Sequence, residues 1–274
     1  MLQTRRRFLR HTLAALATIG AAGTVFFDGF FIKLTTFQLR KNPQPTATLK
    51  IVQISDLHLK SVHFGLRRMC QRINQLHPDL LVLTGDSLDD ATKLGNLDEL
   101  LGLLDATIPK IAVLGNWDYW SHVDLEQLRQ VYARHNCQLL VNQTTSLLLQ
   151  NKRIAISGTD DLVGGAADYA KTIADYQPAD YHLLLTHCPQ YYDFIVTQYH
   201  AAPPIDLVLA GHTHGGQVTF LGFAPYLPPG SGRYVAGWYT AQQPPLYVSQ
   251  GVGTSVLPIR LGPRAEVTLF TIDL

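Results

Sequence analysis

The sequence predicts an α/β fold, because short apolar segments typical of buried strands alternate with segments of helical periodicity. Five of the apolar segments end in polar residues of metal-ligand type, and in α/β sheets sites form outside the carboxyl ends of the strands. These segments span residues 49–54, 80–83, 111–114, 181–185 and 205–210. The part of the chain after the N-terminal segment, about 225 of the 274 residues, suits one sizeable core. We therefore expect one domain over residues 46–274, after a separate N-terminal segment over residues 1–45.

Helical segments lie between the early strands. Apolar residues recur at helical spacing from Leu66 to Leu76 and again from Leu97 to Leu104. His77-Pro78 ends the first of these runs. Asp124 and Gln127 resemble a capping box at the start of a third helix. The apolar faces predict core packing, and the order that follows is β-α-β-α-β.

Shorter strands follow in the second half of the chain. We expect them over residues 146–149, 154–157, 245–249 and 266–272, with the last two closing a second sheet. The segment from Tyr226 to Tyr239 is rich in Pro, Gly and Tyr and shows no period. Its length predicts either a substrate-facing loop or a structural crossover.

The segment from Gly211 to Gln217 holds the most specific motif, Gly-His-Thr-His-Gly-Gly-Gln. Its glycines allow a sharp turn and close approach to a ligand. Neutral imidazole is the commonest nitrogen ligand for transition metals. Two histidines one residue apart, after a buried strand, therefore indicate a metal site.

The five strand ends together carry two carboxylates, one amide and four imidazoles. These residues are Asp56, His58, Asp86, Asn116, His187, His212 and His214. Oxygen and nitrogen ligands without thiolate favour Mn, Fe or Zn. Seven ligands are too many for one ion, and a shared carboxylate allows two. Two ions about 3.5–4 Å apart stabilise both the attacking and the leaving oxygen of a displacement at phosphorus.

The ordered motifs Asp-x-His, Gly-Asp, Gly-Asn-x-Asp, His and Gly-His-x-His resemble the calcineurin-like metallophosphoesterases. The resemblance runs from about Leu49 to the C-terminus. Together with the segment from Ser249 to Gly253, it is similar to the exported bacterial phosphodiesterase branch of that family. It implies two packed mixed β-sheets flanked by helices, and two divalent metal ions.

The resemblance also implies a role for each ligand. Asp56, His58, Asp86 and His214 would hold the first ion, and Asp86 would bridge to the second. Asn116, His187 and His212 would complete the second site. Of the seven, Asp86, Asn116 and His187 are also expected to take part in catalysis.

One position departs from the family pattern. The family usually has histidine after the asparagine, where it protonates the leaving oxygen, and this chain has Trp117. Indole donates a hydrogen bond but no proton near neutral pH. His122 and His63 follow ligand motifs closely and are either replacements or surface histidines. The departure favours substrates with good leaving groups, or protonation by water.

The N-terminus predicts export. Residues Thr4 to Arg10 read Thr-Arg-Arg-Arg-Phe-Leu-Arg, which resembles a twin-arginine signal, and the uncharged stretch from Thr12 to Phe27 follows. We expect recognition by the twin-arginine export machinery, with the segment either cleaved or kept as a membrane anchor. The alternative is an ordinary amphipathic first helix. Lys41 to Ala47 reads as a linker to the domain.

Charge excludes one class of partner. Residues 1–50 carry eight of the 22 basic residues and one of the 21 acidic residues. The other 224 residues therefore hold 14 basic and 20 acidic side chains, a net charge of −6. No nucleic-acid surface is expected. Three widely spaced cysteines, Cys70, Cys137 and Cys188, indicate no disulfide framework.

The predicted function is a dinuclear phosphoesterase at the cell envelope, anchored in the inner membrane facing outward or released to the periplasm. Phosphodiesters and pyrophosphate-linked lipids are the expected phosphate-ester substrates. One alternative is a non-catalytic metal-binding envelope protein that lost its general acid. Another is a mononuclear hydrolase of carbon esters or amides, which needs about three protein ligands and an open position.

Overall fold

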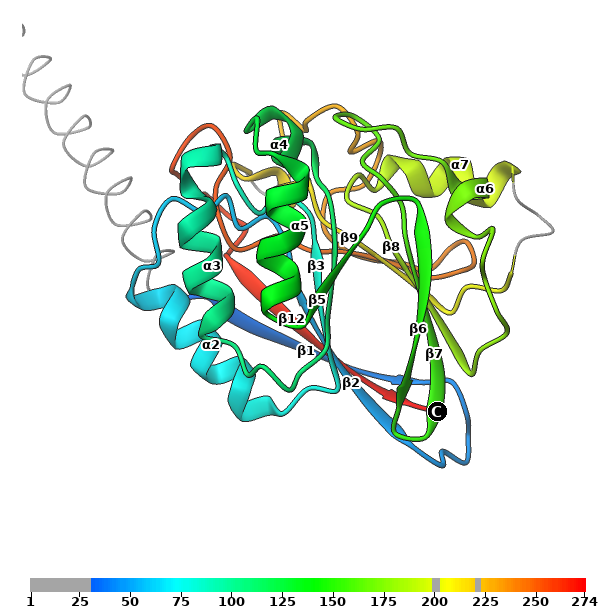
Figure 1. Ribbon diagram of the computed structural model, residues 1–274. Helices are drawn as coiled ribbons and strands as arrows, with labels where there is room; N and C mark the ends of the chain where they lie inside the picture. Colours follow the sequence, from blue (N-terminus) through cyan, green and yellow to red (C-terminus); the bar gives the residue numbers. More distant parts are fainter. Residues whose placement is uncertain (1–30, 199–202, 220–222) are drawn as a thin grey trace, which may run out of the picture.

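The apolar strands form two six-stranded β-sheets that pack face to face (Figure 1). The computed structural model describes residues 31–198, 203–219 and 223–274. In spatial order, the first sheet contains β1 (Lys33–Arg40), β12 (Glu266–Asp273), β2 (Thr48–Ile54), β3 (Leu80–Thr84), β4 (Lys110–Val113) and β5 (Cys137–Leu140). The second contains β10 (Gly237–Tyr239), β11 (Leu246–Val248), β9 (Leu207–Ala210), β8 (Tyr181–Leu185), β7 (Lys152–Gly158) and β6 (Gln143–Leu149).

Parallel pairing dominates the centre of each sheet. Strands β2 to β5 are parallel, and β7, β8, β9 and β11 are parallel in the second sheet. Antiparallel pairs join β12 to β2, β6 to β7 and β10 to β11. Because the central strands of each sheet run in parallel, their carboxyl ends meet at a common edge.

Helices cover the outer face of each sheet. The first sheet is covered by α2 (Phe64–Leu76), α3 (Leu94–Gly102) and α5 (Leu125–Arg134) (Figure 1). The second is covered by α6 (Tyr169–Thr172) and α7 (Gln190–Gln198). The short α4 (Asn116–Trp120) and the 3₁₀ turns η1 (Ala91–Lys93) and η2 (His214–Gly216) lie in connections. This arrangement confirms the predicted fold of two mixed sheets flanked by helices.

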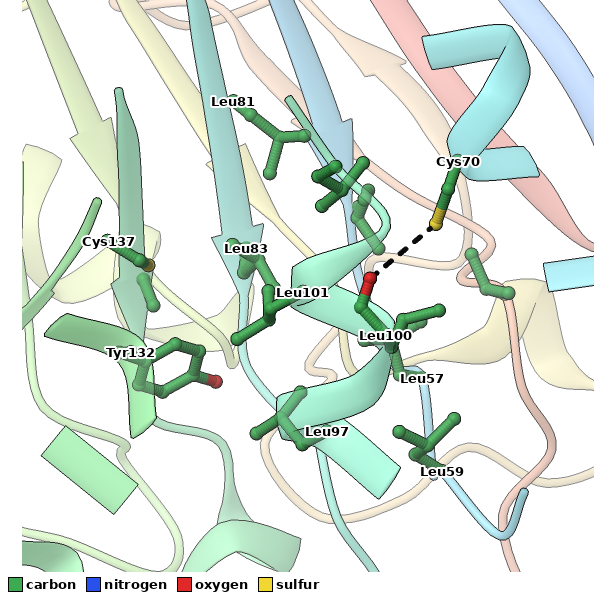
Figure 2. Packing of buried hydrophobic residues seen from close by; sticks show 14 of the residues in the cluster. Leu57, Leu59, Cys70, Leu81, Leu83, Leu97, Leu100, Leu101, Tyr132 and Cys137 are labelled. Carbon is green, nitrogen blue, oxygen red and sulfur yellow. Dashed lines mark hydrogen bonds between the residues drawn. The ribbon is translucent and has the colours of Figure 1, made fainter. Parts of the chain in front are cut away.

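Burial on both faces explains the continuous apolar strands. In β2, Leu49 and Ile51 face the layer between the sheets, whereas Val52 and Ile54 face the helices. Strands buried on both faces read as unbroken apolar runs rather than alternating ones. Figure 2 shows the helix-side cluster, where the Cys70 thiol donates to the carbonyl oxygen of Leu100, 3.9 Å away.

Most predicted elements are confirmed, but one late strand was placed in the wrong sheet. The strand predicted over residues 266–272 is β12, which lies between β1 and β2 in the first sheet. Of the two late strands expected to close the second sheet, only the one predicted over residues 245–249 joins it, as β11. Three strands were missed. β5 is only four residues long and contains the polar Gln138, β10 has only three residues, and β1 lies in the predicted leader.

The predicted division after residue 45 needs correction. All eight residues of β1 pair in parallel with β12, so the first sheet begins at Lys33. The segment read as a linker, Lys41 to Ala47, is a connection within the domain. Its Lys41 Nζ lies 2.7 Å from a carboxylate oxygen of Asp206. Pairing with a distant strand has no local sequence signature, which is why this was missed.

The twin-arginine element and the apolar stretch after it lie outside the described residues. Within residues 31–198, 203–219 and 223–274, no helix combines the length and apolar character needed to cross a membrane.

Candidate metal centre

The structure brings all seven predicted ligands to neighbouring strand ends. Asp56 and His58 follow β2, Asp86 follows β3, and Asn116 follows β4 in the first sheet. From the second sheet, three histidines follow β8 and β9: His187, His212 and His214. None of the seven is more than 4% exposed. Buried polar groups at this density need partners or ions, so the cluster is a site rather than core.

The backbone at these strand ends is unusual. Five of the seven residues have positive φ angles, between 42° and 75°: Asp56, His58, Asp86, His212 and His214. Residues other than glycine rarely adopt this region, and such strain is found at functional sites. These residues, with their left-handed backbone conformation, turn the chain sharply after each strand. Their side chains consequently converge instead of alternating along an extended strand.

Packing also orients His58. Its neighbours Leu57 and Leu59 are buried in the cluster beneath the helices (Figure 2). Figure 2 shows both leucines among the side chains around α3. Because the two neighbours are anchored in the core, the imidazole between them is directed to the metal centre.

The side chains form two groups. In the first, His214 Nε2 lies 2.9 Å from His58 Nε2 and 3.6 Å from Asp56 Oδ1. In the second, His187 Nε2 lies 3.2 Å from both Asp86 Oδ2 and His212 Nδ1. Within each group, ligand atoms from all three residues lie within 4.8 Å of one another. Each group thus offers three ligand atoms to one ion.

Asp86 connects the two groups. Its Oδ2 lies 3.2 Å from His187 Nε2 and 3.5 Å from His58 Nε2. A carboxylate in this position is available to both groups at once. Its other oxygen, Oδ1, accepts the backbone N–H of Trp117 at 2.8 Å, which fixes the orientation of the group.

Three histidines are held by their outer nitrogens. The carbonyl oxygen of Thr84 lies 2.7 Å from His187 Nδ1, and that of Pro229 lies 2.8 Å from His212 Nε2. Because a carbonyl only accepts, these nitrogens carry the protons, and the inner nitrogens are free to bind an ion. Asp89 bonds His58 Nδ1 through its carboxylate. Ligating histidines in proteins are usually oriented in this way.

The fourth histidine has a different partner. A guanidinium nitrogen of Arg260 lies 3.3 Å from His214 Nδ1. Guanidinium only donates, so this ring nitrogen accepts. Burial, followed by the charges of His58 and Arg260, lowers the pKa of His214 well below its usual value. His214 is therefore neutral, and because Nδ1 accepts from Arg260 its proton lies on Nε2 in the metal-free protein. Binding an ion through Nε2 requires the other tautomer, with the proton on Nδ1.

Neighbouring charges keep the Asp86 carboxyl group ionised. Burial alone would raise the pKa of Asp86, but the charge and hydrogen bond of His187 lower it to about 2. In turn, burial lowers the pKa of His187, and the charge of Asp86 outweighs this and raises it well above 6.5. In the metal-free protein the two groups thus form an ion pair, in which the proton occupies the place of a cation.

Two oxygen atoms test whether the site fits metal ions. Asp56 Oδ2 and Asn116 Oδ1 are buried and have no hydrogen-bond partner within the part of the chain that the structure describes. Leaving such atoms unpaired costs about 1–3 kcal/mol each, and more for a charged group. Both belong to the predicted ligand set and are oxygen donors that Mn, Fe and Zn accept. The donor set therefore fits bound divalent ions.

Asp118 organises the loops around the centre. Its oxygens accept the backbone N–H groups of Asp86 at 3.0 Å, Ser87 at 2.9 Å, Leu88 at 3.3 Å and Gly115 at 2.9 Å. Burial and the nearby charge of Asp86 raise the pKa of Asp118 to about 7. This carboxylate ties the end of β3 to the end of β4.

The position of the missing general acid is occupied by Trp117. Its ring lies edge-on to that of His58, with centroids 5.9 Å apart. Of the two suggested replacements, His63 shares with His58 the lining of a cavity of about 180 Å³. His122 is exposed and does not line that cavity. Only His63 therefore has access to the region beside the centre.

Sequence reasoning missed Asp89 and Arg260. Both contact metal-centre histidines, but neither is in a ligand motif. The segment from Tyr226 to Tyr239 also contributes, since Pro229 orients His212. That contact shows a structural role for the segment, and its role toward substrate stays a prediction.

Comparison with known proteins agrees with this geometry. The family model described as Calcineurin-like phosphoesterase matches residues 49–216. The chain belongs to this family. It is accordingly a metal-dependent phosphoesterase, of a family that binds divalent metals.

Two relatives span almost the whole chain. The uncharacterized metallophosphoesterase YkuE of Bacillus subtilis (strain 168) is 29% identical, covering 98% of this chain and 97% of its own. Phosphodiesterase YaeI of Escherichia coli (strain K12) is 30% identical, covering 97% of this chain and 98% of its own. A solved structure, the 5'-nucleotidase precursor from Thermus thermophilus, is 12% identical with a TM-score of 0.48, covering 82% of this chain and 55% of that one.

Proposed function

We propose that the chain is a phosphodiesterase that uses two divalent metal ions. The observation that carries the proposal is the position of Asp86 Oδ2, within 3.5 Å of His58 and 3.2 Å of His187. A carboxylate shared by two groups of ligands is what a two-metal centre requires. A mononuclear hydrolase would leave one of the two groups without a purpose.

The proposed roles follow from the contacts. Two ions at such a centre neutralise charge on both the attacking and leaving oxygens in displacement at phosphorus. Asp56, His58 and His214 would hold one, and His187, His212 and Asn116 the other, with Asp86 shared. The buried carboxylates and neutral imidazoles supply the fixed environment that keeps this geometry before substrate arrives.

One relative favours a diester as substrate, and one residue favours a good leaving group. The relative named phosphodiesterase YaeI is 30% identical over nearly the whole chain. In addition, Trp117 supplies no proton to the leaving oxygen, which disfavours substrates with strongly basic leaving groups. Pyrophosphate-linked lipids, whose leaving group is a phosphate, are the second substrate class that we propose.

The test compares the protein with its Asp86→Asn variant. The metal-loaded parent should contain two ions per chain and hydrolyse bis(p-nitrophenyl) phosphate. Asp86→Asn should lose most of its bound metal and most of its hydrolytic activity, because the bridging charge supports both sites. One ion per fully active chain would contradict the two-metal centre. Two ions without turnover on an activated monoester, an activated diester or a lipid pyrophosphate would favour the non-catalytic alternative.

We also propose that the protein acts at the cell envelope. The support is the twin-arginine element at Arg5 and Arg6, followed by the uncharged stretch from Thr12 to Phe27. Arg5→Lys combined with Arg6→Lys keeps the charge but should retain the protein in the cytoplasm. Unchanged export in cells without twin-arginine machinery would refute the proposal.

A further inference from the structure

Exposed apolar side chains gather between β11 and β12. Val256 is 78% exposed, Leu257 57% and Leu261 52%. The segment is held in place by Gln217, whose Nε2 donates to the carbonyl oxygens of Ser255 at 3.0 Å and Leu257 at 2.9 Å. A loop held by these two hydrogen bonds thus presents the apolar side chains to solvent. Three exposed apolar side chains held on one short segment are a candidate interaction surface.

This loop borders the cavity beside His58. Thr254 and Pro258, on either side of Val256 and Leu257, line the cavity of about 180 Å³ described above. His58 and Arg260 line the same cavity, and both belong to or contact the metal centre. The exposed apolar side chains consequently lie beside a cavity that has one ligand of the metal centre in its wall.

A basic cavity lies next to the first. It has a volume of about 340 Å³ and shares Ile32 with its neighbour. Nine residues line it, among them Lys33, Arg68, Arg72 and Arg264. Four of these residues are basic and none is acidic. The described domain is acidic in balance, so this concentration of positive charge is local.

The N-terminal segment joins the domain at the same place. Phe31, 49% exposed, lines the basic cavity and is the first described residue. The uncharged stretch from Thr12 to Phe27 ends four residues earlier. In Figure 1 the described chain enters at the start of β1, beside α2. An apolar N-terminal segment would therefore leave the domain from the surface that carries both the apolar loop and the basic cavity.

We propose that this surface rests on an anionic lipid bilayer, with the apolar loop inserted and the basic residues against lipid phosphates. Apolar side chains that enter the acyl boundary together with nearby Lys and Arg are the pattern of membrane-surface binding. The charge of the surface is complementary to anionic headgroups. The inference deepens the proposed envelope role and rests on it: the cavity beside His58 lies next to the lipid surface.

The test places a fluorescent reporter in the loop. Leu257→Trp in the full chain is compared with Leu148→Trp on the edge strand β6, where Leu148 is 76% exposed and Leu257 is 57% exposed. The vesicles contain phosphatidylglycerol and phosphatidylcholine, with or without brominated acyl chains. Tryptophans already in the chain contribute the same background to both variants.

Insertion predicts a blue shift and extra quenching by brominated lipid for Leu257→Trp only, and weaker quenching when phosphatidylglycerol is omitted. Equal quenching of both variants and the parent would overturn the inference. A blue shift of Leu257→Trp without vesicles would overturn it too, because the loop would then be covered by protein. Hydrolysis of bis(p-nitrophenyl) phosphate without vesicles reports the proposed activity separately, so failure of one is distinguishable from failure of the other.

Discussion

Asp89 shows how a residue outside the ligand set controls the centre. Its carboxylate bonds His58 Nδ1, which leaves Nε2 facing His214. Burial lowers the pKa of His58, but the hydrogen bond to Asp89 and the charge of Asp86 outweigh it, so the net pKa is raised. Outer carboxylates of this kind fix the ring orientation of a ligand and increase its basicity.

Asp89→Asn should weaken binding at the first metal site by about 10–100-fold, the usual effect of losing such a partner. The matched control is Asp90→Asn. Asp90 caps η1 by accepting the N–H of Thr92 at 2.8 Å and does not contact His58. Metal affinity measured by competition with a chelator should fall only for Asp89→Asn. Equal affinities would mean that Asp89 has no positioning role.

At Trp117, the expected consequence is a steep dependence of kcat/KM on leaving-group pKa. A positioned general acid contributes about 10²–10⁴-fold, and without one the loss grows as the leaving group becomes more basic. Trp117→His should recover less than this range, because the oxygens of Asp118 already accept backbone N–H groups and are poorly placed to orient a new imidazole.

The measurement uses diesters of graded leaving-group pKa. A flat dependence in the parent would show that another group supplies the proton. His63→Ala would then restore the steep dependence if His63 is that group, since it lines the cavity beside His58. His122→Ala serves as the control from outside the cavity.

At the scale of the elements, the site depends on how closely two strand ends approach. A Cβ built on Gly115 would lie 2.2 Å from Asp86 Oδ1 and 2.5 Å from its backbone nitrogen. The end of β4 therefore packs directly on the shared carboxylate. Gly115 has an ordinary φ of −110°, so the requirement is one of space and not of backbone conformation.

Gly115→Ala should destabilise the protein by about 1–3 kcal/mol through overpacking and should lower its metal content, although no ligand is changed. The control is Gly95→Ala in α3, where a Cβ would meet nothing within 4 Å. Helix propensity predicts that this change stabilises by about 0.5–1 kcal/mol. Denaturant unfolding of the metal-free proteins and elemental analysis of the loaded ones provide the comparison. Normal metal content in Gly115→Ala would contradict the close-packing explanation.

At the scale of the whole molecule, metal binding is coupled to the release of protons from histidines that follow strands of both sheets. Burial lowers the pKa values of His58 and His187, yet neighbouring carboxylates raise both above 6.5 overall. For His212 and His214, burial instead keeps the pKa values below 6.5. In the metal-free protein, the first pair thus keeps its protons to higher pH than ordinary histidines do, and the second pair loses them at lower pH.

Loading the centre should release protons from His58 and His187 at pH values where ordinary histidines are already neutral, because metal ions bind only neutral imidazole. Competition by protons weakens as the pH rises. The apparent metal affinity should therefore increase until the pH exceeds the raised pKa values of His58 and His187. Calorimetric titration with Mn²⁺ in buffers of different ionisation enthalpy measures the protons released. A binding enthalpy independent of the buffer would disprove the protonated state of these histidines.

The sequence by itself determined the central strands and the residues at their ends. Apolar runs such as residues 80–83 and 181–185 are local signals, and the ligands directly follow them. The boundaries of β8 match the prediction because burial on both faces extends over the whole strand. The order of the motifs was sufficient to indicate the family.

Only the tertiary structure decided how those ends meet. The centre takes ligands from both sheets, and β12 completes the first sheet by pairing with β1 and β2. The contact of Asp89 with His58 spans 31 residues, and that of Arg260 with His214 spans 46. Such contacts depend on the packing of layers distant along the chain. Local periodicity describes which face of a segment is buried, but not which distant segment covers it.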